Sequence, residues 1–170
     1  MPLTDRKPQG ILRFGLRFPI LLYHLRLGGL FGKRFLLLTH IGRKSGRKLE
    51  TVIEIVHYDE QMGSYYVASG WGTKADWYLN LRKNPIARIM VGKQVFPVQA
   101  FFLSEEDSAQ ELLNYAKRYH FAFKELSYMM TGKRLDGNEE SCRQLAQSVP
   151  IIRFQSTLWQ EPEKYEVSLR

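Results

Sequence analysis

Short stretches of alternating hydrophobic and polar positions, separated by glycines or polar residues, run through most of the chain. Period-2 alternation and brief apolar runs both indicate β-strands. Six strands are predicted, over residues 34–41, 49–58, 64–69, 86–91, 94–103 and 149–154. Two of them form a hairpin around Gly92-Lys93, the length of a tight two-residue turn. The pattern therefore predicts a protein that is mainly β.

Helical spacing appears between the third and fourth strands and again before the last one. Four helices are predicted, over residues 76–83, 104–119, 121–130 and 139–147. Asp76 is the expected N-cap of the first, Ser104 to Asp107 form a capping box for the second, and Gly132 ends the third. One helix inserted among six strands favours a small barrel over alternating βαβ units. The expected fold class is mainly β with peripheral helices (α+β).

The N-terminal part of the chain has a different pattern, apolar and basic. Residues 10–31 are mostly apolar and contain no run near the ~20 residues that a transmembrane helix needs. Two interpretations stay open, an amphipathic helix packed on the barrel or one lying on an anionic membrane. The basic residues that flank the apolar face are Arg13, Arg17, Arg26, Lys33 and Arg34. The predicted division is a helical segment at 1–34, a barrel domain at 35–155 and a polar tail at 156–170.

Charge and cysteine content narrow the classes of partner. The 170 residues carry a net charge of +8, and the first 48 hold 11 of the 25 Lys and Arg but a single acid, Asp5. Such clustering indicates a basic arm and an anion-binding loop, and argues against a nucleic-acid surface. The single cysteine, Cys142, excludes an intrachain disulfide and suits a reducing cytoplasm. The sequence shows no metal-ligand cluster or Ser-His-Asp set, and His40 and His57 are predicted to be structural.

Two glycine-containing segments are candidates for ligand binding. Gly42–Lys48 places four cations around one hydroxyl between two strands, which suits an anion, although a solvated basic turn is the alternative. It is not a phosphate loop of the Walker type, since it opens no helix. Residues 68–81 combine small residues with Trp71, Trp77 and Tyr78, which suits a flat ligand. Here the alternative is that the aromatic side chains anchor the core.

These two segments, with the Val-Pro-Ile-Ile strand that follows, give the chain a resemblance over residues 35–154. Leu-Leu-Thr-His-Ile-Gly-Arg-Lys-Ser-Gly, then Ala-Ser-Gly-Trp-Gly and Asp-Trp-Tyr-Leu-Asn-Leu-Arg-Lys-Asn-Pro, resemble the deazaflavin-dependent nitroreductase family. The resemblance implies the split β-barrel shared with flavin-mononucleotide-binding pyridoxamine-phosphate oxidases. It also implies an oxidoreductase that binds coenzyme F-420, a flat polyanion whose reduced form delivers hydride to quinones, nitroaromatics or enones.

The resemblance also implies a set of coenzyme-binding residues. The basic turn would hold the phosphodiester and acidic tail, the Ser69–Gly72 loop would lie along the ring, and Trp77 with Tyr78 would close its side. The implied residues are Arg43, Lys44, Ser45, Gly46, Ser69, Gly70, Trp71, Gly72, Lys74, Trp77 and Tyr78. Family members commonly have Ser-Lys-Gly-Gly where this chain has Ser69–Gly72, so the ring pocket is expected to differ.

The proton donor and the acceptor are not assigned by the resemblance. The candidate catalytic residues are Glu54, Tyr119 and Tyr128. Glu54 either faces the barrel interior near the coenzyme or is simply solvated, because it alternates with Ile53 and Ile55. Two other functions stay open on the same barrel. One is a reductase that uses flavin mononucleotide, and the other is a non-catalytic carrier of a lipid or haem-derived ligand.

Overall fold

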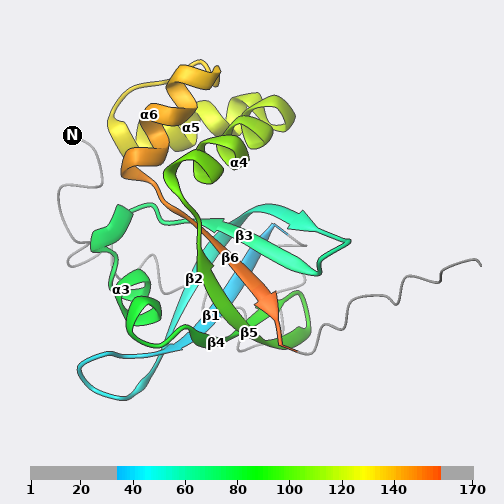
Figure 1. The fold of residues 1–170 in the computed structure, drawn as a ribbon, viewed down its shortest axis with the longest axis vertical. Coiled ribbons are helices and arrows are strands. Elements are labelled where there is room, and N and C mark those ends of the chain that lie inside the picture. Colours follow the sequence, from blue (N-terminus) through cyan, green and yellow to red (C-terminus); the bar gives the residue numbers. More distant parts are fainter. Residues whose placement is uncertain (1–33, 158–170) are drawn as a thin grey trace, which may run out of the picture.

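A closed barrel of six antiparallel strands forms the centre of the molecule (Figure 1). The computed structural model describes residues 34–157, apart from the side chain at position 129. The strands are β1 (Phe35–Ile41), β2 (Lys48–Asp59), β3 (Ser64–Ala68), β4 (Ile86–Val91), β5 (Gln94–Phe102) and β6 (Ile151–Ser156). They are joined in the order β1-β2-β3-β6-β5-β4, with β4 returning to β1. The predicted fold class is confirmed.

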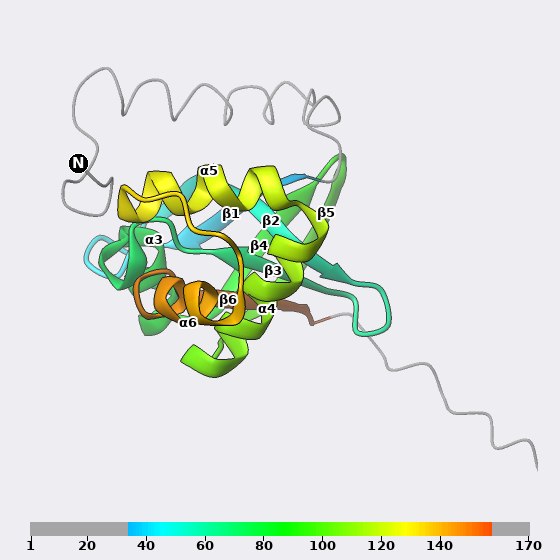
Figure 2. The ribbon, with the colours of Figure 1, turned by 90° about the horizontal axis from the view of Figure 1, so that it is seen from above.

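Helices cover the barrel at one end and along one side. The helical elements are η3 (Gly72–Lys74), α3 (Asp76–Lys83), α4 (Glu105–Arg118), α5 (His120–Thr131) and α6 (Glu139–Ser148). Helices α4, α5 and α6 gather at one end, and α3 lies apart from them beside β1 (Figures 1 and 2). All four predicted helices are present, and their bounds agree with the prediction to within one residue.

Two hydrophobic clusters hold these layers together, and β6 contributes to both. Ile152 and Phe154 point into the barrel interior, whereas Ile151 packs in the cluster under α4–α6. Successive side chains of a strand point to opposite faces, so one strand buries both faces when a helical layer covers the outside of the barrel. Each fully buried side chain of this kind contributes ~1.5–3 kcal/mol. The large side chains at the centre of the second cluster are Leu112, Phe123 and Leu145.

Three local predictions differ in detail from the structure. The last strand begins at Ile151 instead of Val149, because the Val149 N–H bonds the Leu145 carbonyl and still belongs to the end of α6. Ala75, not Asp76, occupies the N-cap of α3, and Asp76 is the first residue of the helix. The Ser104 hydroxyl does accept the Asp107 N–H at 3.1 Å, but the Asp107 carboxylate accepts from that hydroxyl and does not reach back to the backbone.

The predictions for the two ends of the chain concern mainly residues that the structure does not describe. The basic and apolar segment 10–31 lies outside the described residues, as does most of the polar tail predicted from 156 onward. Within 34–157, no helix is both long enough and apolar enough to cross a bilayer.

Candidate functional site

The turn between β1 and β2 uses its own backbone donors to hold its shape. The Gly42 N–H bonds the Arg47 carbonyl and the Gly46 N–H bonds the Gly42 carbonyl, both at 2.8 Å. The Arg47 N–H is bound by the Ser45 hydroxyl at 3.3 Å. The backbone N–H groups of Gly42, Gly46 and Arg47 are therefore all engaged within the turn and are not available to a ligand. An anion at this turn would be bound chiefly by side chains.

Arg43 fastens the turn to α3. Its guanidinium donates to the Asn80 side-chain oxygen at 2.9 Å, to the Asp76 carbonyl at 3.3 Å and to the Asp76 carboxylate at 3.1 Å. The side chain is 25% exposed. The Asp76 carboxylate therefore neutralises part of the positive charge of Arg43, which the sequence analysis assigned to coenzyme binding. The main role of Arg43 in this structure is to hold the turn against α3.

Other cations around this turn point into solvent. The side chains of Lys44, Arg47, Lys48 and Lys74 are exposed, and none of them forms an ion pair with another residue of 34–157. Lys74 lies two residues before Asp76, which binds Arg43, so Lys74 is close to the turn in space. Four uncompensated cations near one hydroxyl, Ser45, match the chemistry of a polyanion.

Under the turn, a neutral histidine supports Asn80. His40 is buried on β1, and its Nδ1 lies 3.2 Å from the Asn80 amide nitrogen. Burial lowers the pKa of His40 to about 4, against a smaller opposing effect of Asp76. The imidazole is therefore neutral near pH 7, and its Nδ1 accepts from the amide. This arrangement agrees with the predicted structural role of His40.

The Ser69–Gly72 loop has glycines because α5 and α6 pack against it. A Cβ at Gly70 would lie 2.9 Å from the Met130 side chain, and one at Gly72, where φ is +59°, would lie 2.6 Å from the Ser148 carbonyl. Ser69 is buried, and its hydroxyl donates to the Gly72 carbonyl at 2.7 Å. Packing against α5 and α6 thus explains why small residues occupy this loop, which the sequence analysis attributed to a flat ligand lying along it.

The aromatic residues of this segment are divided between core and loop. Trp77 and Tyr78 are buried in the barrel cluster. The Tyr78 ring packs edge to face on the Phe102 ring, with 5.1 Å between the ring centroids. The core-anchor interpretation applies to these two side chains. Trp71 is half-buried against the same cluster, and its buried indole N–H has no hydrogen-bond partner among the described residues. A bound group that accepts this N–H would satisfy it.

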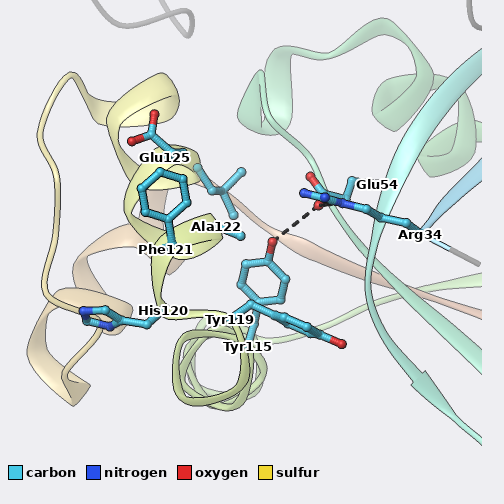
Figure 3. A pocket seen from close by; sticks show the side chains of 9 residues that line it. Arg34, Glu54, Tyr115, Tyr119, His120, Phe121, Ala122 and Glu125 are labelled. Carbon is cyan, nitrogen blue, oxygen red and sulfur yellow. Dashed lines mark hydrogen bonds and ion pairs between the residues drawn. The ribbon is translucent and has the colours of Figure 1, made fainter. Parts of the chain in front are cut away.

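A cavity of about 510 Å³ lies between the middle of β2 and the α4–α5 junction (Figure 3). Its wall on the helical side is largely aromatic and aliphatic, and its wall on the strand side is charged. The lining residues are Arg34, Glu54, Tyr115, Tyr119, His120, Phe121, Ala122, Glu125 and Leu126. Two of the three candidate catalytic residues, Glu54 and Tyr119, come together here. Tyr128 does not line the cavity and lies under the Arg134 guanidinium.

Glu54 follows neither of the two alternatives that the sequence allowed. Ile53 belongs to the barrel cluster, so Glu54 points outward, yet it is only 30% exposed. The Arg34 Nε donates to its Oε1 at 3.0 Å and the Tyr115 hydroxyl donates to the same oxygen at 3.4 Å. Burial, with Glu54 as a second cause, raises the pKa of Tyr115 to about 12. The sequence did not indicate this cluster, because pairing of Phe35 with Glu54 and the α4 register create it.

Arg34 and Tyr115 are thus the site residues that sequence reasoning missed. Arg34 was grouped with the basic flank of the N-terminal segment, and no role was assigned to Tyr115 in the predicted helix 104–119. A smaller cavity of about 400 Å³ lies farther along β2, on the other side of Tyr115, and His57 in its wall places Nδ1 3.0 Å from the Glu111 carboxylate. Among residues 34–157, no three His, Cys, Asp or Glu side chains are grouped to hold a metal ion.

Comparison with known proteins decides the family. The model of the family described as "F420H(2)-dependent quinone reductase" matches residues 24–135, which is more than half of the chain. The chain belongs to this family. It is therefore an oxidoreductase, and the resemblance found in the sequence is confirmed. A Mycobacterium tuberculosis protein, Rv3178, whose name assigns it to the same reductases, is 34% identical over 90 residues, which span 51% of this chain and 74% of the relative.

Solved structures support the fold. The F420-H2-dependent reductase FDR-A matches with a TM-score of 0.50 at 21% identity, over 72% of this chain and 95% of its own. A pyridoxamine 5′-phosphate oxidase-related, FMN-binding protein of Nostoc punctiforme matches with a TM-score of 0.50 at 13% identity, over 90% of this chain and 82% of its own. At these identities the likeness establishes the split β-barrel and leaves the ligand to be argued from this chain's own residues.

Proposed function

We propose that this protein uses reduced coenzyme F-420 to transfer hydride to a flat apolar acceptor, such as a quinone, a nitroaromatic or an enone. The observation that carries the proposal is the group of exposed cations at the β1–β2 turn, which suits the acidic tail of the coenzyme. Flavin mononucleotide has a single phosphate and needs fewer cations. The number of exposed cations therefore favours the deazaflavin.

The coenzyme end of the proposed site rests on the turn and the loop after β3. Lys44, Arg47, Lys48 and Lys74 would bind the phosphodiester and the acidic tail, with the Ser45 hydroxyl among them. Arg43 and Gly46 would keep the turn in shape. The Trp71 indole N–H at the Ser69–Gly72 loop would donate to the ring system, and Trp77 and Tyr78 would support the loop from the core without touching the ring.

The cavity beside α5 is the proposed place for the acceptor. When bound, the reduced deazaflavin supplies hydride, and the protein's own part is to align the acceptor and exclude water. Phe121, Ala122 and Leu126 offer an apolar wall to a flat molecule. Tyr119 lies at the rim with half of its surface exposed. No covalent bond to the protein is needed for this reaction.

The direct test of the activity uses the purified full chain, reduced coenzyme F-420 and a soluble quinone. We expect oxidation of the coenzyme to depend on both the protein and the quinone, and to fall when Lys44 and Lys74 are both changed to Gln. Two results would overturn the proposal. One is a yellow protein with a flavin spectrum that reduces quinones without the deazaflavin, and the other is an inactive protein that retains a lipid or haem-derived ligand through purification.

The cytoplasmic and membrane-surface locations stay predictions. The membrane proposal rests on the apolar residues of 10–31 and on the basic residues around them, each worth ~1 kcal/mol near an anionic surface. Vesicle co-sedimentation of the full chain with anionic and neutral lipids would test it. We expect binding to the anionic vesicles that persists in a few hundred millimolar salt, since inserted apolar side chains are not screened. If the protein pellets with neither the anionic nor the neutral vesicles, the proposed membrane role is wrong.

A further inference from the structure

We propose that the cavity beside α5 is an oxyanion site, in which the Arg34 guanidinium binds the carbonyl oxygen of a flat acceptor as that oxygen gains negative charge. The role in reduction rests on the proposed function, but the binding chemistry belongs to the cavity alone. Arg34 would be a catalytic residue of the acceptor site, and Glu54 and Tyr115 would position it.

The first support is the hydrogen bonding of Arg34. Its Nε donates to Glu54 Oε1 at 3.0 Å, and its two terminal nitrogens form no hydrogen bond with any residue of 34–157 (Figure 3). Arg34 lines the cavity, and 64% of its side chain is exposed. A guanidinium has five N–H donors in a rigid plane, so one bond to Glu54 fixes its direction and leaves four donors for a ligand.

The second support is the way the charges around the cavity are compensated. Glu54 Oε1 also accepts the Tyr115 hydroxyl, which stays protonated at neutral pH because its pKa is raised to about 12 by burial and by Glu54. Glu125, on the opposite wall, pairs with Arg134 at 3.0 Å. His120 and Tyr119 complete the titratable groups of the lining. Both carboxylates thus have partners, and the terminal nitrogens of Arg34 face the space between the walls.

The third support is the shape of the remaining wall. Phe121 is 77% exposed beside the cavity, a large apolar surface that contributes little to folding and suits the face of a planar molecule. Conjugate hydride addition to a quinone or enone moves an electron pair on to the carbonyl oxygen, which then takes one proton from water to give the hydroquinone or the enol. A fixed guanidinium beside that oxygen stabilises the transition state, in which the oxygen carries negative charge, more than the ground state. The inferred acceptor class is a flat, uncharged carbonyl compound.

The experiment measures the ionisation of 4-nitrophenol bound to the full chain, with no coenzyme present. The phenolate absorbs where the neutral phenol does not, so a spectroscopic pH titration gives the pKa of the bound probe. We expect binding to lower that pKa by about one unit, a tenfold rise in the ratio of ionised to neutral probe at a given pH. Arg34→Gln should abolish the shift, and Arg34→Lys, which keeps the charge but loses the planar fork, should retain a smaller one.

Arg88→Gln, at an exposed position on β4, is the matched control and should keep the full shift. Thermal melting of each variant checks that it is folded. A wild-type protein that leaves the probe's pKa unchanged, or a folded Arg34→Gln variant that keeps the shift, would overturn the inference. The proposed function fails separately, if the wild-type protein shifts the probe but does not bind coenzyme F-420. With coenzyme bound, Arg34→Gln should lower kcat at least tenfold with little change in KM for the quinone.

Discussion

The side-chain oxygen of Asn80 accepts two hydrogen bonds from Arg43, one from the backbone N–H at 3.0 Å and one from the guanidinium at 2.9 Å. The amide nitrogen of the same side chain meets His40 Nδ1 at 3.2 Å. One buried amide thus joins β1, the basic turn and α3. The exposed cations of the proposed coenzyme site therefore depend on a neutral, buried network for their position.

Replacing Asn80 by Ala should destabilise the protein strongly. The change leaves the Arg43 N–H and the His40 ring nitrogen without their partner in a buried place, so we expect a loss of about 2–4 kcal/mol in the free energy of unfolding. Urea denaturation measures it. Asn114→Ala, at an exposed position on α4, is the control and should cost less than about 0.5 kcal/mol. Equal losses in the two variants would contradict the role of the network.

His40 should make the protein sensitive to acid. Its pKa is about 4 in the folded state and near 6.5 in an unfolded chain, so the unfolded chain takes up the proton first as the pH falls. The stability is then lost between about pH 6.5 and about pH 4, by up to about 3 kcal/mol. Urea unfolding at several pH values in this window, compared with His40→Gln, measures the contribution. An identical pH dependence in both proteins would show that another group is responsible.

Two glycines with positive φ should respond differently to Ala. At Gly46, where φ is +66° and nothing lies within 4 Å of an added Cβ, we expect only the strain of the left-handed conformation, about 1–2 kcal/mol. At Gly72 the added Cβ would also strike the Ser148 carbonyl at 2.6 Å, so the loss should be clearly larger. Thermal or urea unfolding of both variants decides. If Gly46→Ala is the more damaging change, the packing explanation of the Ser69–Gly72 loop is wrong.

The exposed lysines should affect coenzyme binding without affecting stability. Lys44→Gln and Lys74→Gln should each weaken the binding of coenzyme F-420 about 2- to 5-fold, the range for a solvent-exposed ion pair, with the effect shrinking in high salt. Lys93→Gln, in the β4–β5 turn at the other end of β1, is the matched control and should bind normally. Similar weakening in all three variants would indicate a general charge effect and no specific site.

Strands and helices were predictable because their signals are local. Period-2 alternation, the Gly92-Lys93 turn and the Ser104 cap each depend on neighbouring residues, and these elements form where they were expected. The family resemblance predicted the barrel and the class of enzyme. The start of the last strand was misjudged because the end of α6 is decided by the Val149 N–H bond to Leu145, which a strand pattern does not reveal.

Side-chain partners across the fold were not predictable in the same way. Arg43 looked like a coenzyme ligand, but Asp76 and Asn80 from α3 bind it. Gly70 and Gly72 were predicted to leave space for a ligand, but α5 and α6, which come much later in the chain, pack against them. The Arg34–Glu54–Tyr115 cluster joins the residue before β1 to β2 and α4, and no spacing in the sequence brings these three residues together.

The measurement that tests the central claim most directly is a fluorescence titration of the full chain with oxidised coenzyme F-420, run beside the same titration with flavin mononucleotide. The account predicts that the deazaflavin binds with a Kd below ~100 µM, about 5.5 kcal/mol of affinity, and more tightly than flavin mononucleotide. It also predicts that binding weakens as salt is raised. No binding of the deazaflavin below that concentration, or tighter binding of flavin mononucleotide, would contradict it.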